Sequence, residues 1–286
     1  MTVPREHAGG ILLMLAGVLL FSLNDTLGKW LVETFSVGQV LVLRSLAALL
    51  LLAPFLLRDG LVRLLEVPRP GLQLLRVSFG TVEVASFYWA VSMMPLADAM
   101  TYWMAAPVFV TVISALLLRE RVGAKRFAAV ALGFAGVLLA MGPGIQGDPL
   151  PVLIAIGGAL LYACFVVCTR ALRAARDTQL VAFQMLGALL LGLVLLPFGW
   201  TPPGVLDVAL LLGLGIAATL AHVAVTRSLR IAPASVVVPW QYSFILWGAL
   251  FGWLVFGDVP GPGVALGAAV IVAAGLWLWR LDRGAA

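Results

Sequence analysis

Two ionisable side chains fall near the middle of long apolar stretches of this 286-residue chain: Glu83, within residues 70–93, and His222, within residues 205–228. An ionisable group at the centre of a bilayer costs free energy and usually serves a function. We therefore predict that each is either a substrate contact or a titratable coupling group, since a histidine changes its charge near neutral pH. The alternative is a structural hydrogen bond between helices.

Three further charged residues lie in the first two apolar stretches. Asp25 and Lys29 are four positions apart, so a helix would bring them together, and Arg44 lies about two turns inside the second stretch. We expect a structural or gating ion pair, with Asp25 paired to Lys29 or to Arg44. Alternatively, Lys29 extends to the lipid headgroups and Arg44 lines an outer vestibule.

Aromatic and hydrogen-bonding residues are mixed in two other stretches and predict a pocket with flat apolar walls, suited to an amino acid side chain. These residues are Tyr102, Trp103, Trp240, Gln241 and Tyr242. Ser86 and Tyr88 are lesser candidates for the same pocket. The alternative is an aromatic belt at the membrane interface, where Trp and Tyr are enriched.

Two prolines fall inside the same apolar stretches, Pro107 in residues 97–118 and Pro239 in residues 234–256. Each removes a backbone hydrogen bond and can kink its helix, so we predict two hinges that narrow one end of the cavity while opening the other. The two prolines are not at equivalent positions, so the two gates would not move identically.

The elements that position these residues are apolar helices. The chain is 63% hydrophobic and 11% charged, which a water-soluble domain cannot accommodate. The runs are too long for barrel strands, so we predict an all-α membrane protein with ten transmembrane helices. They cover about residues 9–32, 37–57, 70–93, 97–118, 125–142, 150–171, 178–197, 205–228, 234–256 and 262–279.

Charge supports this count. With cytoplasmic N- and C-termini, the even-numbered connections and the tails contain 16 of the 18 basic residues, Arg76 and Arg170 among them. Only Lys29 and Arg44 fall in the outer half. This distribution agrees with the enrichment of Lys and Arg in cytoplasmic loops.

The chain contains an internal sequence repeat, with one unit in each half. Residues 80–122 align without a gap on residues 218–260, 138 positions later, and residues 17–21 align on 158–162, 141 positions later. We predict two five-helix repeats, residues 1–145 and 146–286. Because five is odd, the second repeat would enter the membrane from the opposite face, as in many secondary carriers built from inverted repeats.

Other classes of protein are disfavoured. The sequence has no Gly-x-Ser-x-Gly, His-Glu-x-x-His or Walker A motif, so we expect neither an enzyme nor direct ATP coupling. The net charge of +5 is spread between apolar runs and does not suggest nucleic acid binding. Cys164 and Cys168 lack nearby His or carboxylate partners, so we expect no metal and no cofactor. The expected partners are a small-molecule substrate and membrane lipid, with the chain a monomer or weak homodimer.

Several short motifs, in order and spacing, resemble the EamA type of the drug/metabolite transporter superfamily over essentially the whole chain. They are residues 20–30, Gln39–Arg44, Pro95–Ala99, Pro107–Thr111, Arg119–Val122, Ala232–Val237 and Phe256–Pro260. The resemblance implies ten helices, a central cavity lined mainly by the third, fourth, eighth and ninth, and export of small metabolites. Similar members export aromatic and other neutral amino acids, while others carry S-adenosylmethionine or riboflavin.

We therefore predict a secondary transporter of the bacterial inner membrane that exports amino acids of broad specificity, aromatic ones included, by alternating access. One alternative is an exporter or uptake carrier of another metabolite, such as S-adenosylmethionine or riboflavin. A structural membrane subunit is the alternative outside transport, and it would not need a polar cavity.

Overall fold

The computed structural model describes residues 5–60, 66–94, 96–118, 123–141, 149–257 and 262–284, and these ranges contain helices and no strand. The longer helices are α1 (Arg5–Val32), α2 (Val37–Asp59), α4 (Pro70–Met93), α7 (Ala124–Met141), α8 (Pro149–Ala171), α9 (Asp177–Leu195), α10 (Val205–Ile231) and α13 (Pro262–Gly284). The shorter ones are α5 (Leu96–Trp103), α6 (Ala106–Leu117), α11 (Ala234–Val237) and α12 (Phe244–Phe251).

Five helical segments of the described chain are long and apolar enough to cross a membrane. They are His7–Val32, Val37–Arg58, Pro149–Ala171, Asp177–Phe198 and Val205–Ile231. The all-helical prediction is confirmed for the described residues. The number of crossings, the side of the termini and the inversion of the repeats stay predictions.

Two stretches predicted as single helices are interrupted. Residues 97–118 form α5 and α6, separated by Met104 and Ala105. Residues 234–256 form α11, a 3₁₀ turn over Val238–Ser243, α12 and a π-helical turn over Gly252–Phe256. Both interruptions fall near a proline, which has no N–H to donate and clashes with a continuous α-helix.

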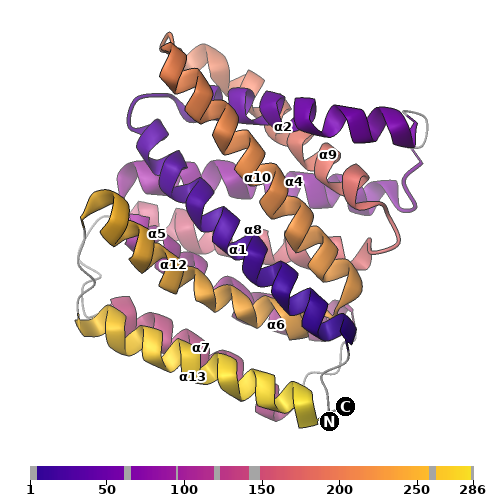
Figure 1. Cartoon of the computed structure of the whole chain (residues 1–286), viewed down its shortest axis with the longest axis vertical. Helices are drawn as coiled ribbons and strands as arrows, with labels where there is room; N and C mark the ends of the chain where they lie inside the picture. The colour runs from indigo at the N-terminus through magenta and orange to yellow at the C-terminus, as the bar shows by residue number, and fades with distance from the viewer. Residues whose placement is uncertain are drawn as a thin grey trace.

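Long-range pairs of helices hold the bundle together. The helix α1 packs along α10, α4 along α8, α2 along α9, and α7 along α13. Figure 1 shows α7 and α13 as a layer at the bottom of the molecule, with α1 and α12 above them. In the same view, the start of α1 and the end of α13 lie at the same end of the bundle.

Polar contacts fix the end of the bundle where α2 begins. The Ser36 hydroxyl caps α2 by accepting the Gln39 backbone N–H at 3.2 Å, and it donates to the Gly199 carbonyl at 2.6 Å. The buried Gln39 amide donates to the Thr201 carbonyl at 2.6 Å and accepts the Thr201 N–H at 2.9 Å. The start of α2 is thereby joined to the connection that follows α9.

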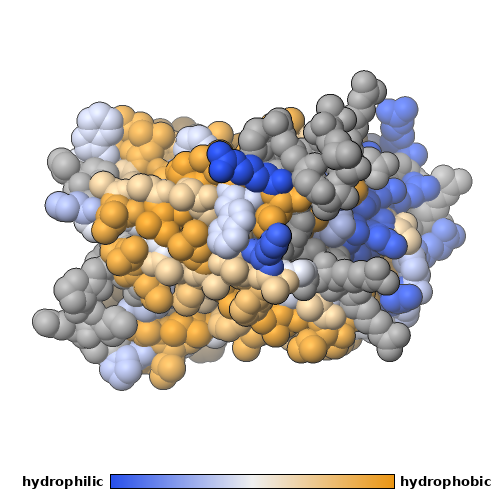
Figure 2. Space-filling model, turned by 90° about the horizontal axis from the view of Figure 1, so that it is seen from below, coloured by the Kyte–Doolittle hydropathy of each residue, from blue (hydrophilic) through white to orange (hydrophobic). Residues whose placement is uncertain are grey.

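The outer surface is apolar over much of its area. The coloured residues on the face in Figure 2 are mostly hydrophobic, and most of the strongly hydrophilic ones gather at one end of it. Large side chains such as Leu50, Leu116 and Val205 are exposed on the described surface. A contiguous apolar surface of this kind suits lipid contact.

Some sequence features lie outside the described residues. These are the predicted junction of the repeats at residues 145 and 146, Pro95 of the Pro95–Ala99 motif, the Arg119–Val122 motif, and part of the Phe256–Pro260 motif.

Candidate functional site

A cavity lies among α1, α2, α4, α5, α8, α10 and the interrupted stretch around α12. Its empty space is about 710 Å³, including the part that is open to solvent. The resemblance implied a lining mainly from four helices, but α1, α2 and α8 also contribute to it. The walls carry both aromatic rings and charged groups.

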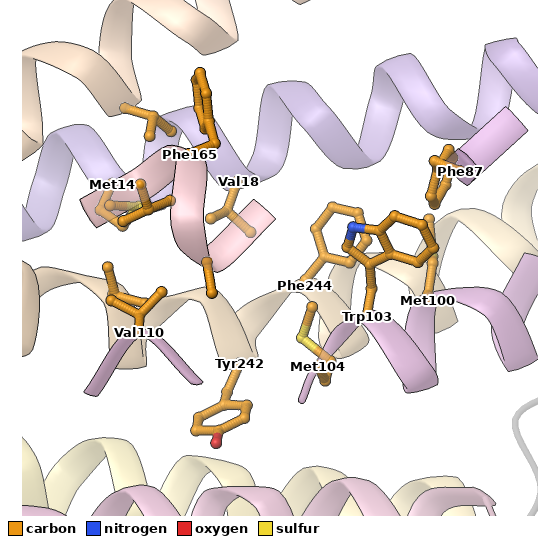
Figure 3. Close-up of a cluster of buried hydrophobic side chains, with 14 of the residues drawn as sticks. Met14, Val18, Phe87, Met100, Trp103, Met104, Val110, Phe165, Tyr242 and Phe244 are labelled. Atoms are coloured by element: carbon orange, nitrogen blue, oxygen red, sulfur yellow. The ribbon is translucent and has the colours of Figure 1, made fainter. Parts of the chain in front are cut away.

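Glu83 and Trp103 form one wall of the cavity. The Trp103 indole N–H donates to Oε1 of Glu83 at 3.0 Å, and both side chains are buried. The Trp103 ring meets Phe87 edge-on at 5.1 Å between centroids and lies tightly against Gly158, where any side chain would collide with the indole. Figure 3 shows the indole among Phe244, Met104 and Met100. Trp103 therefore lies inside the protein, and not in a belt at the membrane interface.

Arg44 lines the cavity from α2. Its Nη1 donates to the Tyr88 hydroxyl at 2.6 Å, and its guanidinium carbon lies 5.5 Å from the centre of the Tyr88 ring. Gly28 leaves room for that ring, since a Cβ there would come within 2.7 Å of Tyr88 Cε1. The buried Nε of Arg44 has no hydrogen-bond partner.

Asp25 also lines the cavity, where its Oδ1 accepts a hydrogen bond from the Asn24 side-chain amide at 2.9 Å. In the described part of the chain, neither Lys29 nor Arg44 comes within 4.0 Å of the Asp25 carboxylate. The expected ion pair is thus not formed in this structure, and Arg44 donates to Tyr88 instead. Lys29 is partly exposed and does not line the cavity.

The second half of the chain supplies neutral polar groups. The Gln241 amide donates to the Tyr162 hydroxyl at 2.5 Å and lies 3.6 Å from the Met14 sulfur. The His222 ring meets Phe21 edge-on, with 4.9 Å between ring centroids, and its buried Nε2 has no partner. The cavity therefore combines two carboxyl groups and one guanidinium from the first half with a histidine, an amide and a phenol from the second.

Equivalent positions of the two repeats meet in this cavity. With the offset of 138 residues, Val84 matches His222, Trp103 matches Gln241, and Ala106 matches Phe244. With the offset of 141, Phe21 matches Tyr162. All eight of these residues line the cavity. The two copies therefore contribute the same positions but different chemistry.

The interrupted helices border the cavity. Trp103, Met104 and Ala106 line it where α5 gives way to α6, and Gln241 and Phe244 line it where the 3₁₀ turn gives way to α12. Pro107 falls in the first turn of α6, and Pro239 falls in the 3₁₀ turn. Interrupted helices occur in membranes where backbone groups are buried in protein or line a cavity. The two prolines therefore lie where a bend would change the shape of the cavity.

Four predicted contacts lie outside the cavity lining: Ser86, Tyr102, Trp240 and Tyr242. The Ser86 hydroxyl donates to the Val82 carbonyl of its own helix at 2.8 Å. The Tyr242 hydroxyl donates to the Val130 carbonyl of α7 at 3.0 Å. Figure 3 shows the Tyr242 ring directed toward the α7 and α13 layer. Tyr242 thus connects α7 to the rest of the bundle.

Replacing Tyr242 by phenylalanine should therefore destabilise the protein without slowing transport. The variant loses one buried hydrogen bond to the Val130 carbonyl, which keeps its backbone bond within α7, so we expect a loss of about 1 kcal/mol. Thermal melting of the purified protein should fall by a few degrees, while the initial transport rate per folded molecule stays at the wild-type value. A rate reduced tenfold at unchanged stability would instead place Tyr242 in the substrate path.

Sequence reasoning missed several cavity residues: Phe21, Asn24, Phe87, Tyr162 and Phe244. Two signals could have found three of them. The repeat alignment matches Phe21 with Tyr162, and Phe244 lies three positions after Gln241, about one helical turn away. Asn24 carries no such signal, because its polar side chain is explained equally well by a contact with Asp25. Within the described residues, no group of three or more His, Cys, Asp or Glu could hold a metal ion.

Comparisons with known proteins identify the family. The EamA-like transporter family matches the chain twice, over residues 8–142 and 149–280. A crystal structure of a protein superposes with a TM-score of 0.82 over 96% of this chain and 98% of that chain, at 18% identity. That similarity concerns the fold alone.

Relatives of known name are bacterial transporters. A riboflavin transporter of Vibrio cholerae is 29% identical over 95% of this chain and 93% of its own length. A riboflavin transporter of Brucella anthropi is 30% identical over 83% of this chain and 86% of its own. A pseudopaline exporter of Pseudomonas aeruginosa is 28% identical over 96% and 97%. The protein is a multi-pass transporter of the bacterial inner membrane, and it belongs to the EamA-like family of the drug/metabolite transporter superfamily.

Proposed function

We propose that the protein moves a small metabolite with a flat aromatic ring and polar ends, through the cavity and by alternating access. Riboflavin is the first candidate. The observation that carries the proposal is the cavity wall, in which aromatic rings alternate with a few hydrogen-bonding groups. The riboflavin transporters among its relatives support the choice of a flavin.

Each cavity group has a role in this proposal. Phe87, Trp103 and Phe244 would stack against the ring of the substrate, since aromatic pairs prefer offset or edge-on contacts. Asn24, Gln241 and the Arg44 guanidinium would bind its polar ends. The interruptions beside Met104 and at Val238–Ser243 would let the halves rock around the bound substrate.

The membrane arrangement we propose is ten crossings, two inverted repeats and cytoplasmic termini. The pairing of helices supports it, because α1 packs on α10 and α4 packs on α8. Among the ten predicted crossings, the first pair joins the first to the eighth, and the second pair joins the third to the sixth. A two-fold relation between the repeats exchanges these two pairs. It also accounts for the meeting of equivalent positions in one cavity.

An amino acid is the second candidate, and the charged groups of the cavity favour it. Arg44 would bind the carboxylate, while Asp25 and Glu83 would bind the ammonium group. The aromatic wall would then hold the side chain, as the sequence predicts for aromatic amino acids.

Transport by the purified protein in liposomes distinguishes these candidates. We expect saturable uptake of riboflavin, inhibited by unlabelled riboflavin and not by tryptophan. Saturable tryptophan uptake without riboflavin uptake would establish the second candidate instead, and movement of neither would contradict the proposal. Everted vesicles, with and without a pH gradient, would test export, which is the direction that the sequence predicts.

A further inference from the structure

A buried arginine lies on the face of α4 that lines the cavity, two turns beyond Glu83. Arg76 is seven residues before Glu83, so the two share one side of the helix about 10 Å apart along its axis. Arg76 is completely buried. Its Nε donates to the Thr169 hydroxyl at 2.7 Å and its Nη1 to the Leu180 carbonyl at 2.9 Å. The remaining terminal nitrogen, Nη2, has no partner.

No carboxylate of the described chain lies within ion-pair distance of Arg76. A buried charge without a counter-charge is strongly unfavourable, and buried charges are normally paired. Two neutral hydrogen bonds do not replace that pair. The position therefore requires an explanation beyond packing.

Two buried glutamines share this region. Gln73 lies one turn before Arg76 on α4, and Gln184 of α9 lies against Gly80, where a Cβ would come within 2.8 Å of both atoms of its amide. Both glutamines are more than nine-tenths buried, and neither atom of either amide has a hydrogen-bond partner. Native proteins rarely leave buried amide groups unsatisfied. Five polar atoms from three side chains thus lack partners along one segment of the bundle.

The ring of Phe165 separates this group from the cavity. The Arg76 guanidinium carbon lies 4.5 Å from the centre of that ring. On the cavity side, His222 meets the same ring edge-on at 6.1 Å. Phe165 also lies against Gly80, between the levels of Glu83 and Arg76 on α4. In this structure, the ring closes the route from the cavity to the arginine.

We propose that Gln73, Arg76 and Gln184 form a second substrate-binding station, reached from the cavity when Phe165 moves aside. Its ligand is a planar group rich in acceptors, either a carboxylate or the carbonyl edge of an aromatic heterocycle, which a guanidinium and two amides can bind. The station rests on the proposed transport of such a solute. It gives the solute a place to bind after it leaves the cavity.

Gln184 offers a substitution for which binding and packing roles predict different outcomes. In Gln184→Met, a side chain of similar size replaces an amide that has no partner, so the melting temperature should stay the same or rise. Transport of riboflavin or tryptophan, whichever the wild type moves, should nevertheless fall about tenfold. Arg76→Lys should lose transport to a similar extent, because an ammonium cannot reproduce the planar fork.

Gln179→Met is the matched control. Gln179 is also buried on α9, but its amide donates to the Glu66 carbonyl at 3.2 Å. This substitution should lower the melting temperature while transport per folded molecule stays unchanged. Wild-type transport by Gln184→Met would overturn the station, and so would a rate that falls only in step with a lower melting temperature.

Water access tests the station without any transported solute. Gln184→Cys, in a chain whose Cys164 and Cys168 are replaced by alanine, should react with a water-soluble maleimide in membrane vesicles. No reaction under conditions that label an exposed cysteine would overturn the station. If the wild type moves neither probe but the cysteine reacts, the substrate proposal fails and the station stands.

Discussion

Replacing Glu83 by glutamine should reduce the initial transport rate about 10- to 100-fold while the protein stays folded. In the wild type, the Trp103 N–H donates to Glu83 at 3.0 Å. The glutamine oxygen can still accept this hydrogen bond, so the wall of the cavity should keep its shape. What disappears is a carboxyl group that is able to carry a negative charge. Hydrogen bonds to charged groups contribute about 1.5–3 kcal/mol, and each 1.4 kcal/mol is a factor of ten. Uptake by equal amounts of folded protein in liposomes measures the effect.

Ser86→Ala is the control for this experiment. Ser86 lies on the same helix, but its hydroxyl donates to its own backbone and does not line the cavity. We expect its transport to match the wild type. If Glu83→Gln also transported at the wild-type rate, the carboxyl group would have only a structural role, as a hydrogen-bond acceptor between helices.

Replacing Arg44 by methionine should reduce transport at least tenfold, because the cavity loses its only guanidinium among the residues described. Tyr88→Phe should have a smaller effect, about fivefold, since it removes a hydroxyl and leaves the charge in place. The order of the two effects is informative. If Tyr88→Phe were as severe as Arg44→Met, the orientation of the guanidinium would matter as much as its charge.

Lys29→Met tests whether transport needs the basic residue in the cavity or any basic residue in the outer half of the protein. Both Lys29 and Arg44 are basic residues predicted in the outer half, but only Arg44 lines the cavity. We expect normal transport from Lys29→Met. Transport reduced equally by Lys29→Met and Arg44→Met would mean that the basic charge acts at the surface, and would remove Arg44 from the substrate site.

The partners of individual charged residues could not be predicted from spacing. Asp25 and Lys29 are four residues apart, yet they form no ion pair. Glu83 and Trp103 are twenty apart and share a hydrogen bond. Spacing along one helix identifies only neighbours on the same surface, whereas these contacts join different helices whose rotation depends on packing across the bundle.

The burial of basic side chains could not be predicted from the sequence either. Counting basic residues assigns Arg76 and Arg170 to cytoplasmic connections, but both side chains are buried within helices. The reason is physical: in a membrane helix, the lipid-facing and core-facing sides are both apolar, so hydropathy does not show which side faces inward. A basic residue near the end of a run then looks like part of a loop, even when the protein buries it.

The sequence by itself determined that the chain is helical and apolar enough for a membrane, that it matches a transporter family twice, and that segments of its two halves align. These properties follow from composition and from patterns along the chain. Only the tertiary structure decided that Trp103 and Gln241 face one cavity while Tyr242 points away from it. The direction in which a side chain points depends on where its helix is interrupted and on how that helix is oriented against its neighbours. Contacts between distant segments determine both.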